Sequence, residues 1–361
     1  MSDFEQFTGT REATGKHAFD VKALESWLRR QLPAFEGPIQ IAMFKGGQSN
    51  PTYQLITPTG RYVMRTKPGP VAQLLPSAHA VEREYAVMSG LANTAVPVPR
   101  MVCLCEDESV IGRAFYLMEY MEGRVLWDQS LPGMTAPQRS AIYDEMNRVI
   151  AALHSVNFAH QGLSGYGKPG NYFERQIGRW SRQYVASITQ PIPEMDRLME
   201  WLPQNIPSMA RDEGMVSIVH GDYRLDNLMF AENKPSVVAV LDWELSTLGH
   251  PLADFSYHCM AWHIPPGIFR GIAGLELDAL GIPSEDSYIR QYCERTGLAT
   301  PEQLKQDWNF YMAYNLFRIA AILQGIAKRA QTGTASSAQA AASGAGAMPL
   351  AQLAWTFAQK S

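Results

Sequence analysis

The residues best suited to chemistry are two carboxylates and one amide in the segment 216–244, which reads VSIVHGDYRLDNLMFAENKPSVVAVLDWE. Asn227 follows Asp222 by five positions, and Asp242 follows it by twenty. Transfer of phosphate to a hydroxyl group needs a carboxylate that orients and deprotonates the hydroxyl, and oxygen ligands that hold Mg²⁺ against nucleotide phosphates. We therefore expect Asp222 to be a catalytic base and Asn227 and Asp242 to be Mg²⁺ ligands.

Short strands are expected to position these side chains. The apolar run 216–219 predicts a buried strand that delivers the loop His220 to Asp222. Two further runs, 228–230 and 237–241, predict a strand pair closed by a turn, with Asp242 at its end. The three polar groups should then meet at the mouth of one small sheet. The plainer alternative is a polar loop that only caps strand ends.

The pattern HGDxxxxN, followed by DWE, resembles the aminoglycoside phosphotransferase and choline kinase family, whose members phosphorylate small molecules on a protein-kinase-like fold. Protein kinases carry the same catalytic-loop Asp, an Asn five residues later and an Asp on the next hairpin. This sequence differs from theirs at Gly221, Trp243 and Glu244. The resemblance implies Mg²⁺ with ATP or GTP as cofactors. It also implies that His220 stabilises the backbone of the loop and does not transfer a proton.

A second acidic position follows in the segment LSTLGHPLADFSYH. Related sequences commonly carry a GDPxxD pattern there. In this chain His250 replaces the first acid and Asp254 retains the second. By resemblance, Asp254 should brace the catalytic loop through hydrogen bonds, whereas the role of His250 stays open.

Composition limits the classes of protein to consider. The 361 residues exceed what one compact core usually holds, so two lobes are expected. A formal charge of −4 without a basic stripe argues against a nucleic-acid partner, and no uninterrupted apolar run is long enough to span a membrane. The acidic first residues lack a signal-peptide core, and the four cysteines show no metal-binding spacing. These features favour a cytoplasmic protein with free thiols.

The first lobe is expected to span residues 1–122, with a leading helix over 20–32 that Asp20 caps. Five strand-like runs predict an antiparallel sheet, and a helix from Ser77 to about Leu91 should lie between its third and fourth strands. The strands are expected at 39–44, 52–56, 61–66, 101–105 and 114–120.

The connection KGGQSNP between the first two strands holds Gly46, Gly47, Ser49 and Asn50. Exposed backbone N–H groups in such a loop can bind phosphates, as in the glycine loop of kinases. A Gly-Gly pair between strands is also an ordinary hairpin. Agreement with the distant HGDxxxxN motif favours the phosphate-binding interpretation.

The third strand ends in YVMRTK, where kinases place a phosphate-binding lysine that pairs with a helix acid. Strand position favours Arg65, and Lys67 is the second candidate. Of the two acids Glu82 and Glu84 on the following helix, spacing favours Glu84. An exposed helix glutamate with no such role is the alternative.

The break at YMEG marks the boundary between the lobes near residue 122. By analogy with a kinase hinge, backbone groups from Glu119 to Met121 should bind adenine. The second lobe, 123–361, is expected to be mainly helical and to carry the catalytic loop 220–227 and Asp242. The expected fold is thus a bilobal, protein-kinase-like α+β fold.

Helices of the second lobe are predicted from caps and apolar periodicity. Arg175, on the helix YFERQIGRWSRQY, and Arg224, in the catalytic loop, are candidates for binding an anionic substrate. A Thr/Ala/Ser/Gly-rich stretch, 332–348, is expected to be a mobile loop.

The helices of the second lobe are expected from Thr135 to His154, over 172–184, over 285–296, from Thr300 to about Ala330, and over 349–359.

The segments RYVMRTKPGP, LLPSAHAVEREY, VPVPRMVCLCED and HGDYRLDNLMF resemble the kinase-like domain at the N-terminus of certain acyl-CoA dehydrogenase family proteins. That resemblance implies a hydroxyacyl-CoA acceptor and a functional link to an acyl-CoA dehydrogenase. The chain leaves no room for a flavin domain, so dehydrogenation is not expected of it. The alternatives are an aminoglycoside- or choline-type kinase, a nucleotide-binding regulatory module without catalysis, and a hydrolase; the last lacks a nucleophile motif.

Overall fold

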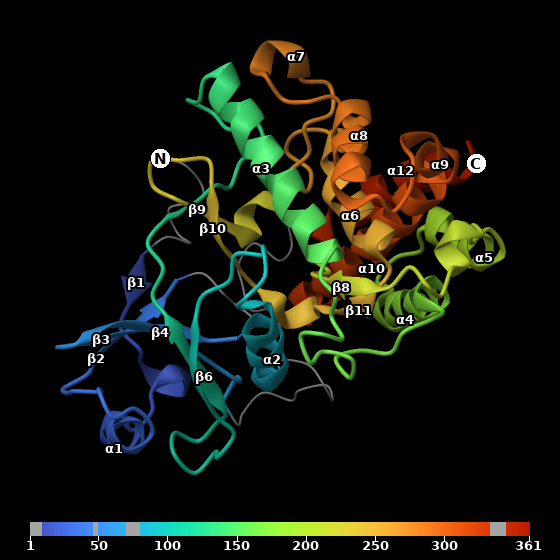
Figure 1. Ribbon diagram of the computed structural model, residues 1–361. Coiled ribbons are helices and arrows are strands. Elements are labelled where there is room, and N and C mark those ends of the chain that lie inside the picture. Colours follow the sequence, from blue (N-terminus) through green and yellow to red (C-terminus); the bar gives the residue numbers. More distant parts are fainter. Residues whose placement is uncertain (1–8, 46–49, 70–79, 333–343) are drawn as a thin grey trace. The chain divides into compact units, whose positions relative to one another are not determined.

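The computed structural model describes residues 9–45, 50–69, 80–332 and 344–361 (Figure 1). The chain forms two compact units, and each consists of several chain segments. Unit 1 comprises Met1–Trp127, Ala159–Tyr166 and Leu228–Leu245, and unit 2 comprises Asp128–Phe158, Gly167–Asn227 and Ser246–Ser361.

The main sheet of unit 1 is antiparallel, with strand order β1-β2-β3-β4-β6-β5. All five predicted strands are present within a residue or two, but the sheet has a sixth strand at its edge. That strand, β1, has two exposed polar residues and therefore no apolar pattern from which to predict it. The strands are β1 (Thr10–Arg11), β2 (Gln40–Phe44), β3 (Thr52–Thr57), β4 (Gly60–Thr66), β5 (Met101–Cys105) and β6 (Phe115–Glu119).

Two helices cover the two faces of this sheet (Figure 1). Helix α1 (Val21–Gln31) begins at Asp20, whose carboxylate accepts hydrogen bonds from the first-turn backbone, and Trp27 packs edge-on against Phe115. Helix α2 (Val81–Leu91) contacts β5 and β6 from the other face, where Tyr85 meets Tyr116. The predicted cap Ser77 lies outside the described residues; Ala80 occupies the N-cap position.

A second small sheet also belongs to unit 1. Strand β9 (Leu228–Phe230) pairs with β10 (Val237–Val240), as predicted, and on its other side with β7 (Arg124–Val125). The pairing with β7 brings the segment 228–245, including Asp242, into unit 1, although the sequence analysis placed this segment in the second lobe. The unit also contains the short 3₁₀ helices η2 (Gly15–His17) and η5 (Trp243–Leu245).

Unit 2 is mainly helical, with one two-stranded sheet of β8 (Ser217–Val219) and β11 (Thr247–Gly249). Its 3₁₀ helices are η3 (Met209–Arg211), η4 (Leu225–Asn227) and η6 (Met260–Trp262). Its α-helices are α3 (Ala136–His154), α4 (Tyr172–Ser187), α5 (Pro193–Gln204), α6 (Pro251–Cys259), α7 (Leu277–Leu280), α8 (Glu285–Thr296), α9 (Pro301–Gln306), α10 (Trp308–Gln331) and α12 (Ala347–Ala358).

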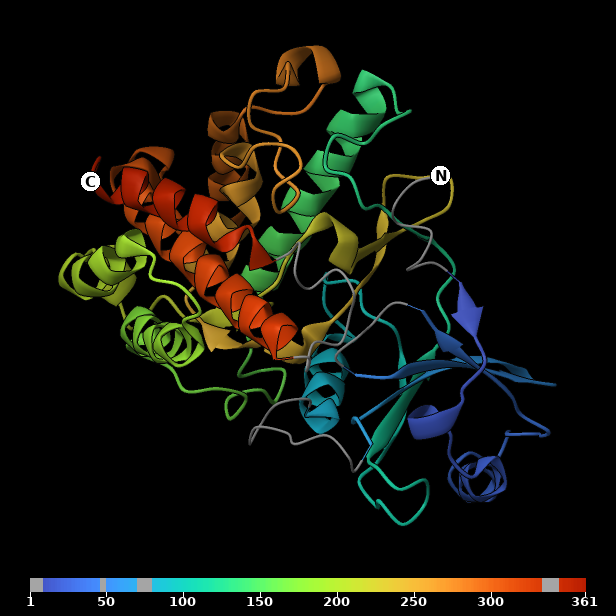
Figure 2. The same cartoon turned by 180° about the vertical axis from the view of Figure 1, so that it is seen from behind.

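Helix α10 is the centre of this unit. Most of its residues are buried, and α4, α5, α6 and α12 pack around it; Figure 2 shows α12 lying along α10. The single helix predicted from Thr300 is in fact two helices. Thr300 and Gln303 form the capping box of α9, and the helix ends before Asp307, a residue type that favours caps over helix interiors. Most of the predicted mobile loop, residues 333–343, lies outside the described residues, and α12 begins two residues before the predicted start.

The four cysteines are free thiols. Burial raises the pKa of Cys103 to about 12 and that of Cys293 to about 11, and it also raises the pKa values of Cys105 and Cys259. All four thiols are therefore protonated at neutral pH. Within the described parts of the chain, no helix combines the length and apolar character needed to cross a membrane.

Gly123 offers a test of the contact between β7 and β9. A Cβ atom on this glycine would lie 2.5 Å from the carbonyl oxygen of Phe230 and 2.7 Å from Met229 Cγ. We expect Gly123→Ala to lower the free energy of unfolding by about 2 kcal/mol, because the backbone must shift to relieve the clash. Gly60→Ala is the matched control, since its nearest neighbour would be 3.9 Å away. Equal midpoints for both variants in urea denaturation would contradict the expectation.

Candidate active site

Arg65 lies near the end of β4, and the alternation of side chains along this strand decides which face it takes. Met64 belongs to the core that contains α1, so Arg65 points to the opposite face, which α2 covers. There Arg65 Nε lies 2.9 Å from Glu84 Oε2, and both side chains are almost fully buried. Lys67, the second candidate, pairs instead with Glu82 at 3.0 Å in a more exposed position. The structure therefore pairs the strand cation and the helix acid that the sequence favoured.

Two further donors hold the carboxylate of Glu84. Asn50 Nδ2 donates to Oε1 at 2.6 Å, and the Tyr116 hydroxyl donates to Oε2 at 3.2 Å. A buried carboxylate needs such partners, because unpaired charge is costly away from water. Gly46, Gly47 and Ser49 of the predicted phosphate loop lie outside the described residues.

Arg65 also binds Asp242, which follows β10. Arg65 Nη2 lies 2.6 Å from Asp242 Oδ1 and 3.9 Å from Glu244 Oε2. Burial alone would lower the pKa of Arg65, but Glu84 and Asp242 outweigh it and raise the pKa well above its usual value. Asp242 has a left-handed backbone (φ 62°), which costs about 1–3 kcal/mol at a residue other than glycine. The ion pair helps to hold it there.

In unit 2, strand β8 leads into the loop 220–227, which the sequence predicts to be catalytic, and Asp254 on α6 holds this loop. The backbone N–H groups of His220 and Gly221 donate to the two carboxylate oxygens of Asp254 at 2.7 and 2.8 Å. These are the bracing hydrogen bonds that the resemblance implied for Asp254. Gly221 has φ +82°, a conformation that favours glycine. On the other side of the loop, Arg318 of α10 donates to the Gly221 carbonyl.

The carboxylate of Asp222 is oriented at both oxygens. The Tyr257 hydroxyl donates to Oδ1, and Arg224 Nη2 lies 3.0 Å from Oδ2. Asn227 Nδ2 donates to Oδ2 at 3.1 Å and to the Asp222 carbonyl at 2.8 Å. The amide nitrogen of Asn227 is thus engaged with Asp222, and its amide oxygen is the atom that could bind a cation. These contacts fix the direction of the carboxylate.

Two residues of this loop environment were missed by the sequence analysis. Tyr257 lies three positions after Asp254 on one helix, so both face the same side, and that spacing could have revealed it. Arg318 has no such signal, because it comes from a distant helix. Its guanidinium lies 5.0 Å from the Tyr257 ring centre and 5.5 Å from that of Trp180. Cation–π contact of this kind stabilises a buried positive charge.

Two buried histidines support the loop indirectly. His154 Nε2 lies 3.3 Å from Asp254 Oδ2, and its Nδ1 contacts the Tyr292 hydroxyl at 2.7 Å. His250, whose role the sequence left open, is the N-cap of α6: its Nδ1 accepts from Leu252 N–H at 3.2 Å. Its Nε2 lies 3.1 Å from the Met209 carbonyl. A neutral imidazole therefore caps α6 at the position where the GDPxxD pattern has its first acid.

The remaining predicted site residues have contacts other than those described above for Arg65 and Asp222. The N–H group of Glu119 donates to the Arg100 carbonyl, and Met121 lies outside regular secondary structure. Arg175 donates to the Lys168 carbonyl at 2.6 Å. Asn227 belongs to unit 2 and Asp242 to unit 1. Within the residues that the structure describes, no group of three or more His, Cys, Asp or Glu side chains is arranged to hold a metal ion.

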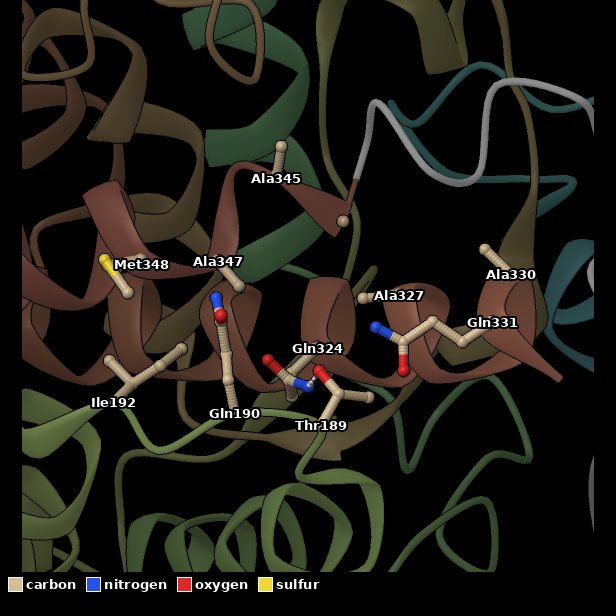
Figure 3. A pocket seen from close by; sticks show the side chains of 11 residues that line it. Thr189, Gln190, Ile192, Gln324, Ala327, Ala330, Gln331, Ala345, Ala347 and Met348 are labelled. Carbon is tan, nitrogen blue, oxygen red and sulfur yellow. Dashed lines mark hydrogen bonds between the residues drawn. The ribbon is translucent and has the colours of Figure 1, made fainter.

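A cavity of about 320 Å³ lies elsewhere in unit 2, between the α4–α5 connection, α10 and the start of α12 (Figure 3). The side chains of Gln190, Gln324 and Gln331 project into it, and Gln324 donates to the Thr189 hydroxyl at 2.7 Å. None of the site residues predicted from the sequence lines this cavity. It is separate from the catalytic loop and takes no part in the candidate active site.

The family model of the phosphotransferase enzyme family matches residues 40–305. The chain is similar to a Ralstonia eutropha JMP134 protein of known crystal structure, provisionally named an aminoglycoside phosphotransferase. It is 60% identical, covers 95% of this chain and 99% of that one, and has a TM-score of 0.86. The fold is therefore the α+β, protein-kinase-like fold of small-molecule phosphotransferases. The chain belongs to the phosphotransferase enzyme family.

Two further similarities extend this comparison. Acyl-CoA dehydrogenase family member 10 from Mus musculus is 47% identical over 97% of this chain, which spans only 32% of that protein's length. Aminoglycoside phosphotransferase APH(4)-Ia, in a ternary complex with AMP-PNP and hygromycin B, is 14% identical with a TM-score of 0.56; the match covers 92% of this chain and 98% of that one. The second similarity shows the fold alone.

The two ion pairs of Arg65 can be tested by Arg65→Lys. A lysine has one terminal nitrogen and cannot reproduce the separate contacts of Nε with Glu84 and of Nη2 with Asp242. We expect the variant to lose about 1–3 kcal/mol in the free energy of unfolding, measured by urea denaturation. Arg61→Lys, at an exposed ion pair with Glu122, should change it by less than about 0.5 kcal/mol. Similar losses in both variants would refute this role of Arg65.

His250 should make the protein sensitive to acid. Burial lowers its pKa to about 4, so between the ordinary value of 6.5 and pH 4 the unfolded chain binds a proton that the folded chain excludes. The free energy of unfolding is therefore highest above pH 6.5 and decreases as the pH falls from 6.5 towards 4. His250→Asn keeps an oxygen for the helix cap and removes the titration.

Between pH 7 and pH 5, the wild type should lose up to about 2 kcal/mol more than the His250→Asn variant in urea denaturation. His160→Asn, at an exposed position, is the control and should follow the wild type. Parallel pH profiles for His250→Asn and the wild type would show that His250 does not titrate in this way.

Proposed function

We propose that this protein transfers the γ-phosphoryl group of Mg·ATP or Mg·GTP to a hydroxyl group of a small molecule. The observation that carries the proposal is the environment of Asp222, whose loop is braced by Asp254 and whose carboxylate is directed by Tyr257 and Asn227. A carboxylate held in one orientation suits a group that must meet a substrate hydroxyl in one geometry.

Asp222 is the proposed base. It accepts a hydrogen bond from the acceptor hydroxyl and takes its proton as the new oxygen–phosphorus bond forms and the bond to the leaving nucleotide oxygen breaks. Tyr257 keeps Oδ1 of this carboxylate fixed, so that the hydroxyl is oriented before transfer. His220 and Asp254 serve the backbone of the loop rather than the proton transfer.

Mg²⁺, when bound, would neutralise the charge that develops on the phosphates. The donor chemistry fits this ion: Asn227 offers an amide oxygen, since its nitrogen is engaged with Asp222, and Asp242 offers a carboxylate. Arg65 would bind phosphate oxygens, and Glu84 would position it. Gly46, Gly47, Ser49, Glu119 and Met121 are proposed to contact the nucleotide, as the sequence analysis expected.

We further propose a hydroxyacyl-CoA as the acceptor and a functional link to an acyl-CoA dehydrogenase. The support is the similarity to acyl-CoA dehydrogenase family member 10, of which the chain spans about a third. An aminoglycoside or choline acceptor is the alternative. The four free thiols are in keeping with the cytoplasmic location that the sequence suggested.

Asp222→Asn tests the proposed base. The amide has nearly the same shape but cannot take the proton, so we expect transfer to fall by about 10²–10⁴-fold while nucleotide binding is retained. The assay follows label from γ-labelled Mg·ATP into hydroxyacyl-CoAs, free hydroxy acids, choline and aminoglycosides. Asp286→Asn, at an exposed ion pair on α8, is the control and should keep full activity.

Two outcomes would count against the proposal. An Asp222→Asn variant that kept most of its turnover would exclude Asp222 as the base. A wild type that binds Mg·nucleotide but phosphorylates none of the acceptors would favour the regulatory module instead.

A further inference from the structure

A second arginine stands beside the catalytic loop and has no place in the function described so far. Arg270 comes from the segment between η6 and α7 and forms an ion pair with Asp226 Oδ2. The same oxygen lies 3.5 Å from Arg224 Nη2, and Arg224 in turn reaches Asp222 Oδ2 at 3.0 Å. Asp226 therefore joins two guanidinium groups next to the proposed base.

The segment that carries Arg270 is held in one unusual conformation. Phe269 and Arg270 are consecutive residues with left-handed backbones, at φ 39° and 60°. Such strain persists only where the surroundings enforce it, and it is common at binding sites. The backbone N–H of Ile272 donates to the Ala261 carbonyl at 2.8 Å, which ties down the end of the segment. The Phe269 ring lies 5.8 Å from the guanidinium of Arg224.

Solvent access differs among the four charged side chains of this cluster. The side chain of Asp226 is only 5% exposed, whereas those of Arg224 and Arg270 are 22% and 27% exposed. Asp222 is 21% exposed, and its carboxylate is assigned to the acceptor hydroxyl. The guanidinium groups of Arg224 and Arg270 are therefore partly accessible to solvent, whereas the carboxylate of Asp226 that pairs with both is almost fully shielded.

This arrangement favours an anion over a cation. Burial, followed by the nearby charge of Arg224, lowers the pKa of Arg270, so a positive charge at this position is held at some cost. An anionic oxygen between the guanidinium groups would offset that cost with charge-assisted hydrogen bonds.

We propose that Arg270, together with Arg224, binds an anionic group of the phosphate acceptor. The inference rests on the proposed function and narrows its substrate class to acceptors with a carboxylate or a phosphate group. Either source supplies the same chemistry: the carboxylate of a free hydroxy acid, or a phosphate of its CoA thioester. The carboxylate is a planar oxygen anion and the phosphate a tetrahedral one, and a guanidinium group can bind either through two donors.

Arg270→Gln tests this proposal with three acceptors that share one hydroxyacyl group. They are the free hydroxy acid, its CoA thioester, and its neutral pantetheine thioester, which lacks the phosphates. We expect the variant to raise KM about 10–100-fold for the acceptor whose anion is bound. The KM values for the neutral pantetheine thioester and for Mg·ATP should stay unchanged. An effect on the free acid alone identifies the carboxylate, and an effect on the CoA thioester alone identifies the phosphates.

Arg290→Gln, at an exposed position on α8, is the matched control and should leave all KM values unchanged. Urea denaturation checks that the Arg270→Gln variant is folded. If the Arg270→Gln variant is not folded, the Arg270→Lys variant is used in its place. Lysine keeps the positive charge but cannot make the two-donor contact, so we expect a smaller rise in the same KM. Unchanged KM values for every anionic acceptor would overturn the proposal. An equal rise for the neutral thioester, or a rise in KM for Mg·ATP, would overturn it too.

Equilibrium binding separates this inference from the proposed function. Isothermal titration calorimetry with free CoA and with the free hydroxy acid requires no turnover. One outcome is that the wild type binds one of these probes, the Arg270→Gln variant does not bind it, and no phosphate transfer is found. In that case the anion site is supported and the kinase assignment fails. If transfer proceeds and Arg270→Gln alters neither binding nor KM, the anion site fails alone.

Discussion

The carboxylate of Asp254 is the constraint on which the proposed catalytic loop, residues 220–227, depends. It is buried, and burial by itself would raise its pKa, yet hydrogen bonds and the nearby His154 and His220 lower the pKa below its ordinary value. Its two oxygens accept the N–H groups of two consecutive loop residues, so the carboxylate holds the backbone of the loop at two adjacent positions. A buried ion of this kind contributes specificity more than stability, because a loop that leaves it unpaired is costly. The loop backbone sets the position of Asp222, and the contacts with Tyr257, Arg224 and Asn227 then direct its carboxylate.

In unit 1, the same logic applies to a buried cation. Arg65 satisfies Glu84 with one nitrogen and Asp242 with another, which a single ammonium group could not do at these positions. The arginine thereby links the sheet, α2 and the residue after β10. Arg65 therefore keeps the ion pair with the helix acid Glu84, although protein kinases carry a lysine at this position of the strand.

The sequence predicted those parts of the structure that local patterns determine. The five longer strands, the capped helix α1 and the β9–β10 pair follow from periodicity, caps and turn signals, whereas the pairing of Arg65 with Glu84 follows from the resemblance to protein kinases. Features that depend on long-range contacts were not predicted. Strand β1 has no apolar pattern, the pairing of β7 with β9 moves Asp242 into unit 1, and Arg318 and Arg270 reach the loop from distant segments. No spacing within the sequence encodes such approaches.

The protonated thiols also have a practical consequence. Since burial keeps all four cysteines in the unreactive thiol form at neutral pH, maleimide reagents should react slowly with the native chain. A cysteine introduced at an exposed position of each unit would then be the preferred point of attachment for a fluorophore. Pairs of such labels would allow the distance between the two units to be followed in solution as nucleotide and acceptor are added, without removing any natural cysteine.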